Sequence, residues 1–372
     1  MKGERFNVIY HIRGDETAAL EKARIICFEQ TVELPEELVV TDSMIRDWIV
    51  GQIDQFSPAQ EGIFEAQISY AVETSAYELT QLLNIIFGNT SIKPGIRVAD
   101  IEFSEGILAK FSGPRFGIQG LREILGVHDK PLLCSALKPM GKSVQEIAKL
   151  AYYFALGGVD VIKDDHGITD QPFCPYYERV KACVEAVEKA NQETGQKCLY
   201  APNITAPVPE ISERVQFARK IGAGGLLICP GLSGFDTMRM LAEDDEVNLP
   251  IISHPAFLGS MVTSPENGFS HAVIFGQLQR LAGADVSIYP NYGGRFGFTR
   301  EECESISKSC RAHMGTYRPI FPSPGGGMTM EKVPDMLELY GNDVMFLMGG
   351  GLYGRSPDLV ENVRYFLSLI GR

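Results

Sequence analysis

Apolar and polar residues alternate in blocks along most of the chain. From about residue 131 onward, short apolar runs are each followed by a longer amphipathic stretch. The run Leu-Leu-Ile-Cys at 226–229 is apolar without interruption, which is typical of a parallel strand buried on both faces. The predicted strands are 131–139, 159–165, 197–205, 225–232, 249–255, 285–290, 317–322 and 343–348. The clearest predicted helices are 143–156, 176–191, 211–221, 299–313 and 357–370.

This rhythm predicts an α/β fold. Eight strand–helix units over roughly 240 residues have the size of a (β/α)₈ TIM barrel, which we place at residues 119–372. An open doubly wound sheet is the structural alternative, but eight regular units favour a closed barrel. Residues 1–118 form a separate N-terminal α+β domain by their pattern. Its predicted strands are 6–12 and 65–72, and its predicted helices are 16–30 and 76–84.

Polar residues gather where the predicted barrel strands end. In such a barrel the active site lies at the carboxyl ends of the strands. Seven of the eight predicted ends carry polar or glycine residues, while the strand bodies are apolar. These ends hold Lys138, Lys163, Asp165, His166, Asn203, Thr205, His254, Asn291, Arg295 and the glycine runs 325–327 and 349–351. This distribution indicates an enzyme.

The end of the second predicted strand carries the strongest chemical signal. Residues 159–167 are Val-Asp-Val-Ile-Lys-Asp-Asp-His-Gly, so an apolar strand ends in four ionisable groups. Lys163 and Asp165 point to one side of a strand, and Asp164 points to the other. Desolvating these groups costs several kcal/mol unless a metal, a substrate or mutual pairing offsets it. A functional site explains them, and a solvated strand end with a Lys–Asp pair is the alternative.

The two glycine runs follow the seventh and eighth predicted strands. Glycine lets backbone N–H groups approach an anion closely, and a helix N-terminus favours negative charge. In many TIM barrels the loops after these two strands bind phosphate. Tight turns use the same residues, but two runs at these two places indicate a phosphorylated ligand. The predicted phosphate-binding residues are Gly326, Gly327, Gly349 and Gly350.

Taken in order, the motifs resemble those of the RuBisCO-like proteins, relatives of the large subunit of ribulose bisphosphate carboxylase. Residues 157–165 with Gln-Pro-Phe at 171–173 resemble the metal-site segment of that family, and residues 111–120 resemble its interdomain segment. Leu-Lys-Pro at 137–139, Asn-Ile-Thr at 203–205 and both glycine runs fall in the family's order. The resemblance covers nearly the whole chain. It implies a ferredoxin-like α+β domain followed by a TIM barrel.

The resemblance also implies a metal centre. Lys163 matches the lysine that reacts with CO₂ to form a carbamate, which then binds Mg²⁺; Mn²⁺ is the alternative ion. Asp165 matches an aspartate ligand of that ion, and His166 stands where the family has a glutamate ligand. Imidazole is a poorer ligand than carboxylate for Mg²⁺, but it suits Mn²⁺, Zn²⁺ or Fe²⁺. His166 could instead act as an acid or base near neutral pH.

Other roles follow from the same resemblance. Lys138, Lys163 and Arg295 are expected to be catalytic. Lys138 matches the base that removes a proton next to a carbonyl, and Arg295 falls near a flexible-loop lysine of the carboxylase. His254 is expected to be catalytic, and Asn203 to bind substrate. Asn89 is expected to be catalytic and Glu29 to bind substrate, since their counterparts reach the neighbouring subunit's active site. A homodimer or a higher assembly of dimers is therefore expected.

Two departures bear on the ligand. The arginine that binds the second phosphate in the carboxylase is replaced by Pro255, and a nearby histidine is replaced by Ile288. Without those groups a second phosphate lacks its partners, so we expect a small-molecule substrate with one phosphate. Carboxylation of ribulose bisphosphate is not expected.

Composition narrows the class of partner. The chain has 372 residues and a formal net charge of −13, which argues against a nucleic-acid partner. It opens without an apolar signal segment and contains no run long enough to cross a membrane, so we expect a cytoplasmic protein with no membrane partner. The eight cysteines show no CxxC spacing and are expected to be buried thiols.

Three functions remain open from the sequence. The first is a metal-dependent lyase or isomerase that forms an enediolate from a monophosphorylated keto sugar or sugar acid and then loses CO₂ or cleaves a C–C bond, as relatives do with 3-oxo-isoapionate 4-phosphate. The second is the 2,3-diketo-5-methylthiopentyl-1-phosphate enolase of methionine salvage, against which Asn89 and His166 argue. The third is a non-catalytic regulatory protein, against which the set Lys138, Lys163 and Asp165 argues.

Overall fold

The computed structural model describes residues 3–39 and 41–372. The chain divides into two compact units. Unit 1 consists of Met1–Ser112, Leu258–Leu278 and Met314–Tyr317, and unit 2 consists of the segments Gly113–Phe257, Gln279–His313 and Arg318–Arg372. The expected boundary after residue 118 lies inside helix α5 (Gly117–Leu125). Two segments from the later part of the chain belong to unit 1, so the units are interleaved in sequence.

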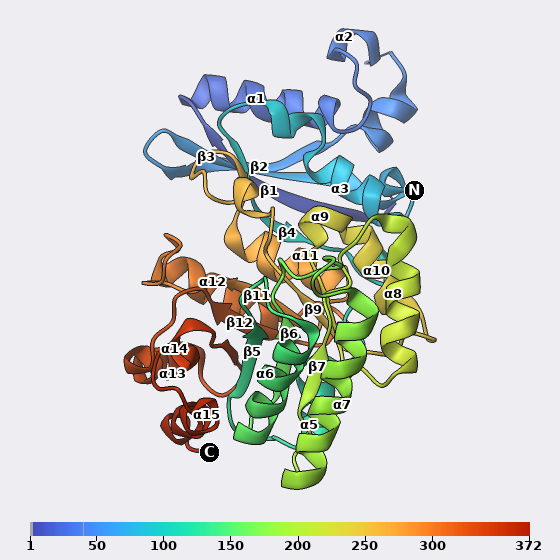
Figure 1. The fold of residues 1–372 in the computed structure, drawn as a ribbon. Helices are drawn as coiled ribbons and strands as arrows, with labels where there is room; N and C mark the ends of the chain where they lie inside the picture. Colours follow the sequence, from blue (N-terminus) through green and yellow to red (C-terminus); the bar gives the residue numbers. More distant parts are fainter. Residues whose placement is uncertain (1–2, 40) are drawn as a thin grey trace. The chain divides into compact units, whose positions relative to one another are not determined.

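Unit 1 contains a five-stranded sheet in the order β10-β4-β1-β3-β2. Its four long strands pair antiparallel, with helix α1 after the first strand and α3 after the third. This is the ferredoxin-like arrangement expected from the resemblance. Residues of β1 alternate between buried and half-buried, so one face of the sheet forms a core with α1 (Figure 1). The strands are β1 (Arg5–Arg13), β2 (Gln52–Gln60), β3 (Ile63–Ala71), β4 (Ile96–Glu102) and β10 (Gly268–Phe269).

The sequence pattern missed three of these strands, β2, β4 and β10. Most residues of β2 are exposed, and Pro58 lies within it, so an apolar alternation is lacking. The helices of this part are α1 (Glu16–Glu29), α2 (Glu36–Val39), η1 (Ile45–Ile49), η2 (Val72–Ser75), α3 (Leu79–Phe87), η3 (Asn89–Ile92), α4 (Glu105–Leu108), η4 (Gly259–Met261) and η5 (Val273–Gln277). Helix α11 (Leu278–Leu281) follows η5 and leads back into unit 2.

Unit 2 contains the eight parallel strands of a TIM barrel. They form two four-stranded sheets, β13-β5-β6-β7 and β12-β11-β9-β8. A bridge between Asn203 and Leu227 joins β7 to β8, and β12 packs on β13, which closes the ring. The strands are β5 (Leu132–Leu137), β6 (Val161–Asp164), β7 (Leu199–Ala201), β8 (Leu226–Ile228), β9 (Ile251–Ser253), β11 (Val286–Pro290), β12 (Phe321–Gly325) and β13 (Met345–Leu347). The expected barrel is confirmed.

The core of unit 2 lies inside this ring. Apolar side chains from all eight strands form one buried cluster, which also includes Ile118, Leu121 and Leu125 of α5. Figure 1 shows α6 and α7 alongside β5, β6 and β7. The helices that follow the strands are α6 (Val144–Gly157), α7 (Tyr176–Thr194), α8 (Val208–Lys220), α9 (Pro230–Ser233), α10 (Phe235–Glu243), α12 (Arg300–Arg311), η6 (Met330–Lys332), α13 (Val333–Tyr340), α14 (Gly350–Tyr353) and α15 (Leu359–Leu369).

The seventh strand begins later than the sequence pattern indicates. Residues 317–322 were the expected strand, whereas β12 is Phe321–Gly325 and Tyr317 belongs to unit 1. Pro322 and Pro324 read as strand breakers, yet both lie within β12, which pairs with β11 on one side and packs on β13 on the other. Consequently Gly325 is part of the strand, and only Gly326 and Gly327 belong to the loop that follows.

Two further expectations concern the whole chain. All eight cysteines are buried free thiols, as expected from their spacing. None of the helices in residues 3–39 and 41–372 is both long enough and apolar enough to cross a bilayer.

Asp285, which precedes β11, ties α5 to the barrel. Its Oδ1 accepts hydrogen bonds from the backbone N–H groups of Phe116 and Gly117, both at 2.7 Å, and its Oδ2 accepts one from Ile251 at 2.9 Å. Burial raises the pKa of this carboxyl to about 6, although the three hydrogen bonds act in the opposite direction. Asp285 therefore titrates at a higher pH in the folded protein than in the unfolded chain.

We expect Asp285 to make stability depend on pH. Between the usual pKa of 3.8 and about 6, the folded protein holds a proton that the unfolded chain has released. The contribution of this group to the free energy of unfolding therefore falls as pH rises through that window, by up to about 1.4 kcal/mol per pH unit. Urea unfolding at pH 4.5, 5.5 and 6.5 should show that the variant Asp285→Asn lacks this share of the slope. Identical slopes in the two proteins would contradict the assignment.

Candidate active site

The alternation of β6 decides which ionisable groups face the barrel interior. Val161 belongs to the central apolar cluster, and Lys163 lies two residues further along the same face. Asp164 lies on the opposite face, toward the helices. Asp165 is the first residue after the strand and returns to the side of Lys163. The strand therefore delivers one amine and one carboxylate to the mouth of the barrel.

Lys163 is buried, with 1 % of its surface exposed. Its Nζ donates a hydrogen bond to the backbone carbonyl of Asp164 at 3.1 Å. Burial lowers the pKa of this ammonium, and the charge of Lys138 acts in the same direction, whereas Asp165 opposes the shift. The lowered pKa makes the neutral amine of Lys163, which is the form that reacts with CO₂, more available.

Asp165 lies between two basic side chains. Its Oδ1 is 4.0 Å from Nζ of Lys138 and 3.7 Å from Nδ1 of His166. Burial works to raise the pKa of this carboxyl, but the interaction with His166 and the charge of Lys163 outweigh it and hold the pKa below its usual range. Asp165 is therefore a carboxylate at neutral pH, in a setting that favours an anion.

His254, which follows β9, meets the same cluster. Its ring stacks on that of His166, with the centroids 4.1 Å apart and the planes 16° from parallel. Its Nδ1 accepts a hydrogen bond from the backbone N–H of Ala256 at 3.2 Å. Burial and the charge of Lys163 hold the pKa of His254 well below its usual value. With Nδ1 occupied as an acceptor, the neutral ring carries its proton on Nε2.

A buried charge pair holds the loop that follows β6. Asp164 and Arg179 of α7 each have 0 % of their side-chain surface exposed, and the Arg179 guanidinium is 3.3 Å from Asp164 Oδ2. Tyr200 donates to Asp164 Oδ1 at 2.8 Å. Arg179 also donates to the backbone carbonyls of Thr169 at 2.6 Å and Cys174 at 2.8 Å. The pair thus connects β6, α7 and the loop that carries Asp165.

The sequence pattern did not identify Arg179 or Tyr200 as part of the site. A signal for Arg179 existed, since helical spacing places it on the same face as Tyr176, Val180 and Cys183, all of which are buried. An arginine on the buried face of a helix calls for a buried acceptor. Which acceptor it meets is not visible in the sequence.

Asn203 also holds this loop. It is fully buried, and its Nδ2 donates to the carbonyls of His166 at 3.0 Å and Ile168 at 3.1 Å. Its Oδ1 accepts from the backbone N–H of Thr205 at 3.1 Å. The Asn203 side chain, which was expected to bind substrate, is therefore hydrogen-bonded to the backbone of the protein. A substrate contact would require these bonds to be exchanged.

The glycine loops after β12 and β13 lie side by side. A Cβ on Gly351 would lie 2.9 Å from the carbonyl of Met328, so the backbones are close. Gly326 and Gly327 have φ of +84° and +94°, a conformation that L side chains rarely adopt. A Cβ on Gly349 would lie 3.0 Å from Nζ of Lys138. The predicted phosphate loops and the predicted base are therefore neighbours.

Arg295 lies on the exposed loop after β11. Its backbone N–H donates to the carbonyl of Gly326 at 3.1 Å, and its guanidinium stacks over the ring of Phe296 at 5.1 Å from the centroid. The side chain is exposed. Arg295 thus lies beside Gly326, at the rim of the glycine loops.

Glu29 and Asn89 come together within unit 1. Asn89 Nδ2 donates to Glu29 Oε1 at 3.2 Å, and Lys93 lies 3.3 Å from Glu29 Oε2. The sequence pattern named Glu29 and Asn89 separately and did not include Lys93, which follows Asn89 by one helical turn. The three side chains form one polar cluster of mixed charge.

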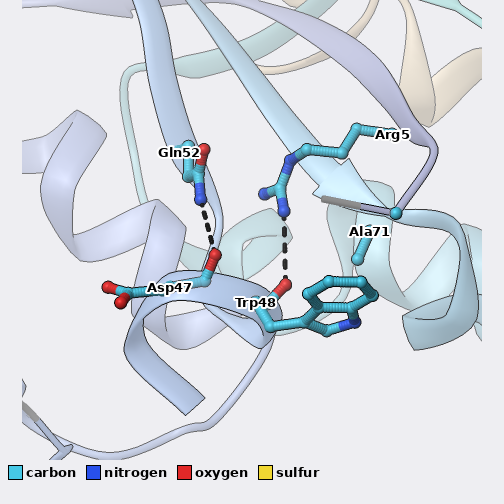
Figure 2. Close-up of a pocket in the computed structure, with 6 residues that line it drawn as sticks. Arg5, Asp47, Trp48, Gln52 and Ala71 are labelled. Carbon is cyan, nitrogen blue, oxygen red and sulfur yellow. Dashed lines mark hydrogen bonds between the residues drawn. The ribbon is translucent and has the colours of Figure 1, made fainter. Parts of the chain in front are cut away.

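A hollow elsewhere in unit 1 holds none of the predicted site residues. Figure 2 shows that Arg5, Asp47, Trp48, Gln52 and Ala71 line it. Arg5 donates to the carbonyl of Trp48 at 3.2 Å, and Gln52 donates to that of Asp47 at 3.0 Å. Arg5 and Gln52 therefore use their donors on backbone carbonyls of unit 1, and packing accounts for the hollow.

The donors at the barrel mouth fit a divalent ion if Lys163 carries a carbamate. In the described part of the chain, no three His, Cys, Asp or Glu side chains lie close enough together to hold a metal ion. Asp165 and His166 supply a carboxylate oxygen and an imidazole nitrogen, and Lys163 acts electrostatically on the same carboxylate. A carbamate on Lys163 would add a third, anionic donor. These donor types suit a divalent cation.

Comparison with known proteins identifies relatives of this chain. Residues 117–294 match the family described as ribulose bisphosphate carboxylase large chain, catalytic domain. Ribulose bisphosphate carboxylase-like protein 1 of Rhodopseudomonas palustris is 37% identical over 98% of this chain and 96% of the relative. The 5-methylthioribulose-1-phosphate isomerase of Rhodospirillum rubrum is 34% identical over 99% and 96%. A 2,3-diketo-5-methylthiopentyl-1-phosphate enolase of Bacillus pumilus is 33% identical over 85% and 79%.

Solved structures agree with these relatives. A RuBisCO-like protein from Rhodopseudomonas palustris superposes with a TM-score of 0.89 and 34% identity, covering 99% of both chains. A dimeric archaeal RuBisCO from Hyperthermus butylicus gives a TM-score of 0.88 and 26% identity over 99% of this chain and 90% of that one. Sequence and fold therefore point to one family over nearly the full length.

Proposed function

Because this chain belongs to the RuBisCO-like proteins of the ribulose bisphosphate carboxylase large-chain family, we propose that it moves a proton next to the carbonyl of a phosphorylated keto sugar, forming an enediolate. One observation carries the proposal: the amine of Lys138 lies beside both Asp165 and Gly349. The acid–base group, the candidate ion ligand and the candidate phosphate loop thus lie together at the mouth of the barrel. A substrate anchored by its phosphate would present its carbonyl carbons to the amine.

Lys138 is the proposed base. Its side chain is about one-third exposed, so it can exchange protons with water between turnovers. Asp165, 4.0 Å away, is a carboxylate that restrains the position of the amine. A base must reach the proton that it abstracts, directly or through one water, and the amine of Lys138 lies next to the loop that would hold the substrate by its phosphate.

A bound divalent ion would polarise the substrate carbonyl and so acidify the neighbouring C–H bond. Asp165, His166 and a carbamylated Lys163 would hold it, with Mg²⁺ as the first expectation from the family. His254 presents Nε2–H, which can hydrogen-bond to the oxygen that becomes negative as the proton leaves. Arg295 on the rim adds positive charge near the anionic ligand.

A single phosphate is part of the proposal. Gly326, Gly327, Gly349 and Gly350 would bind it through backbone N–H groups. A Cβ on Gly350 would meet no atom within 4 Å, so this turn faces open space that a ligand could occupy. The expected place of a second phosphate is apolar, since Pro255 follows His254 and Ile288 is buried in the core.

The fate of the enediolate separates two substrate classes. The isomerase of Rhodospirillum rubrum and the enolase of Bacillus pumilus are named for rearrangements of methylthio-bearing sugar phosphates. These names favour return of the proton to another atom, and so isomerisation or enolisation, over the loss of CO₂ that the sequence first suggested. Decarboxylation of a 3-oxo-isoapionate 4-phosphate type of substrate stays the second candidate, because His166 departs from the family pattern.

A homodimer belongs to the same proposal. Glu29 and Asn89 form a polar cluster with Lys93 in unit 1. By the resemblance, such residues complete the active site of a neighbouring subunit. A dimeric archaeal relative supports this assembly.

Proton exchange in D₂O tests the proposed reaction. The protein, supplied with Mg²⁺ or Mn²⁺ and bicarbonate, is incubated with 5-methylthioribulose 1-phosphate, 2,3-diketo-5-methylthiopentyl 1-phosphate, 3-oxo-isoapionate 4-phosphate or ribulose bisphosphate. NMR should show loss of a carbon-bound proton next to the carbonyl for at least one monophosphate, faster than for the bisphosphate. Lys138→Met should abolish the exchange, whereas Lys149→Met on the exposed face of α6 should not. No exchange with any of the four compounds would refute the proposal.

A further inference from the structure

We propose that His166 is a nitrogen ligand of the divalent ion and that it shifts the preference of the site from Mg²⁺ toward first-row transition ions such as Mn²⁺, Fe²⁺ or Zn²⁺. This inference rests on the proposed function only in assuming that an ion binds beside Asp165. It concerns the identity of the ion and of its ligands rather than the reaction.

The separation of the two donors is the first observation. Nδ1 of His166 lies 3.7 Å from Oδ1 of Asp165, which is too far for a hydrogen bond. Two ligand atoms that each lie about 2.0–2.2 Å from one ion can be up to about 4 Å apart. The pair is therefore spaced as two ligands of one ion would be, with room between them.

The orientation of the imidazole is the second observation. Stacking on His254 fixes the plane of the His166 ring, and Asn203 fixes its backbone by donating to the His166 carbonyl at 3.0 Å. A histidine nitrogen binds a metal in the plane of its ring. Because the two ring planes are nearly parallel and 4.1 Å separates the centroids, the rings do not point their lone pairs at one ion. Of the two histidines, only His166 therefore supplies a nitrogen ligand to the ion, and the stacked ring of His254 holds the orientation of His166.

The chemistry of the donors then sets the preference. Mg²⁺ is small, demands octahedral geometry and binds oxygen, whereas imidazole suits later, softer divalent ions. A glutamate at this position would complete an oxygen-only set with Asp165 and a carbamate. His166 replaces one anionic oxygen by a neutral nitrogen, which weakens Mg²⁺ binding more than it weakens binding of a transition ion.

Metal titrations compare the wild type with His166→Glu, which restores an oxygen ligand. After treatment with a chelator, each protein is titrated calorimetrically with MgCl₂ or MnCl₂ in bicarbonate buffer. We expect the ratio of Mn²⁺ affinity to Mg²⁺ affinity to fall by about tenfold in His166→Glu. The control His128→Gln alters an exposed histidine outside the site and should keep the wild-type ratio. An unchanged ratio in His166→Glu would overturn the inference.

Pulsed electron paramagnetic resonance of the Mn²⁺-loaded protein observes the ligand directly. The wild type should show hyperfine coupling to one histidine nitrogen, which ¹⁵N-histidine labelling identifies. His254→Phe, which keeps a stacking ring, should retain the coupling, and His166→Gln should lose it. Absence of the coupling in the wild type overturns the inference whatever the variants do. Proton exchange with Mg²⁺ but no nitrogen coupling would reject this inference and leave the proposed reaction standing, and the converse result would reject only the reaction.

Discussion

Replacing Lys163 by methionine is expected to abolish metal-dependent proton exchange while leaving the fold intact. Lys163 has 1 % of its surface exposed, and burial already disfavours its charged form. Methionine fills a similar volume and removes a buried amine, so the free energy of unfolding should stay the same or rise. The reaction, in contrast, should lose the third donor of the ion, at a cost of several kcal/mol in the transition state, or about a thousandfold in rate.

Three measurements separate the two effects. Urea unfolding reports stability, NMR in D₂O reports exchange, and ¹³C NMR with labelled bicarbonate reports a carbamate, which the wild type should show and Lys163→Met should lack. Lys149→Met, which removes an exposed lysine of α6, is the matched control and should change neither exchange nor the carbamate signal. If Lys163→Met retained metal-dependent exchange at the wild-type rate, the role assigned to Lys163 would be wrong.

The largest expected effect on stability comes from Arg179. Its guanidinium is 3.3 Å from Asp164 Oδ2, and both side chains are fully buried. Replacing Arg179 by methionine leaves the buried Asp164 carboxylate without its cationic partner, and it removes the donor to the carbonyls of Thr169 and Cys174. Breaking one partner of a buried pair costs about 3–5 kcal/mol, and we expect a loss of that size in the free energy of unfolding.

Urea unfolding checks this value against two other variants. Adding Asp164→Asn to Arg179→Met removes the stranded charge and should recover part of the loss. Arg300→Met breaks an exposed pair with Asp335, whose side chains are 38% and 50% exposed, and should cause a much smaller change. Equal effects of Arg179→Met and Arg300→Met would show that the buried pair does not hold the loop.

The sequence pattern was sufficient for the elements that alternate regularly. Strands such as Leu226–Ile228 are apolar throughout because helices and core cover both faces, and that property is local. The pattern failed where local chemistry opposes the final structure. Pro322 and Pro324 lie in β12 although proline usually breaks a strand, and β2 lacks alternation because most of its residues are exposed.

The sequence by itself determined the barrel and the positions from which its chemistry arises. Eight apolar runs at regular spacing leave few other folds, and in a barrel the carboxyl ends of parallel strands meet at one mouth. Lys138, Lys163, Asp165 and His254 could therefore be selected from their positions after apolar runs. The side to which Lys163 and Asp165 point followed from the two-residue period of a strand.

Only the tertiary structure decided what surrounds these groups. Arg179 meets Asp164, Asn203 turns inward to the loop at His166, and the rings of His166 and His254 stack. These contacts join residues of different strands and helices, and their partners depend on how the strands are placed around the ring. Local spacing carries the period of each strand or helix but not the distance between two of them, so the environment of each charge, and with it each pKa, is settled only when the chain closes into a barrel.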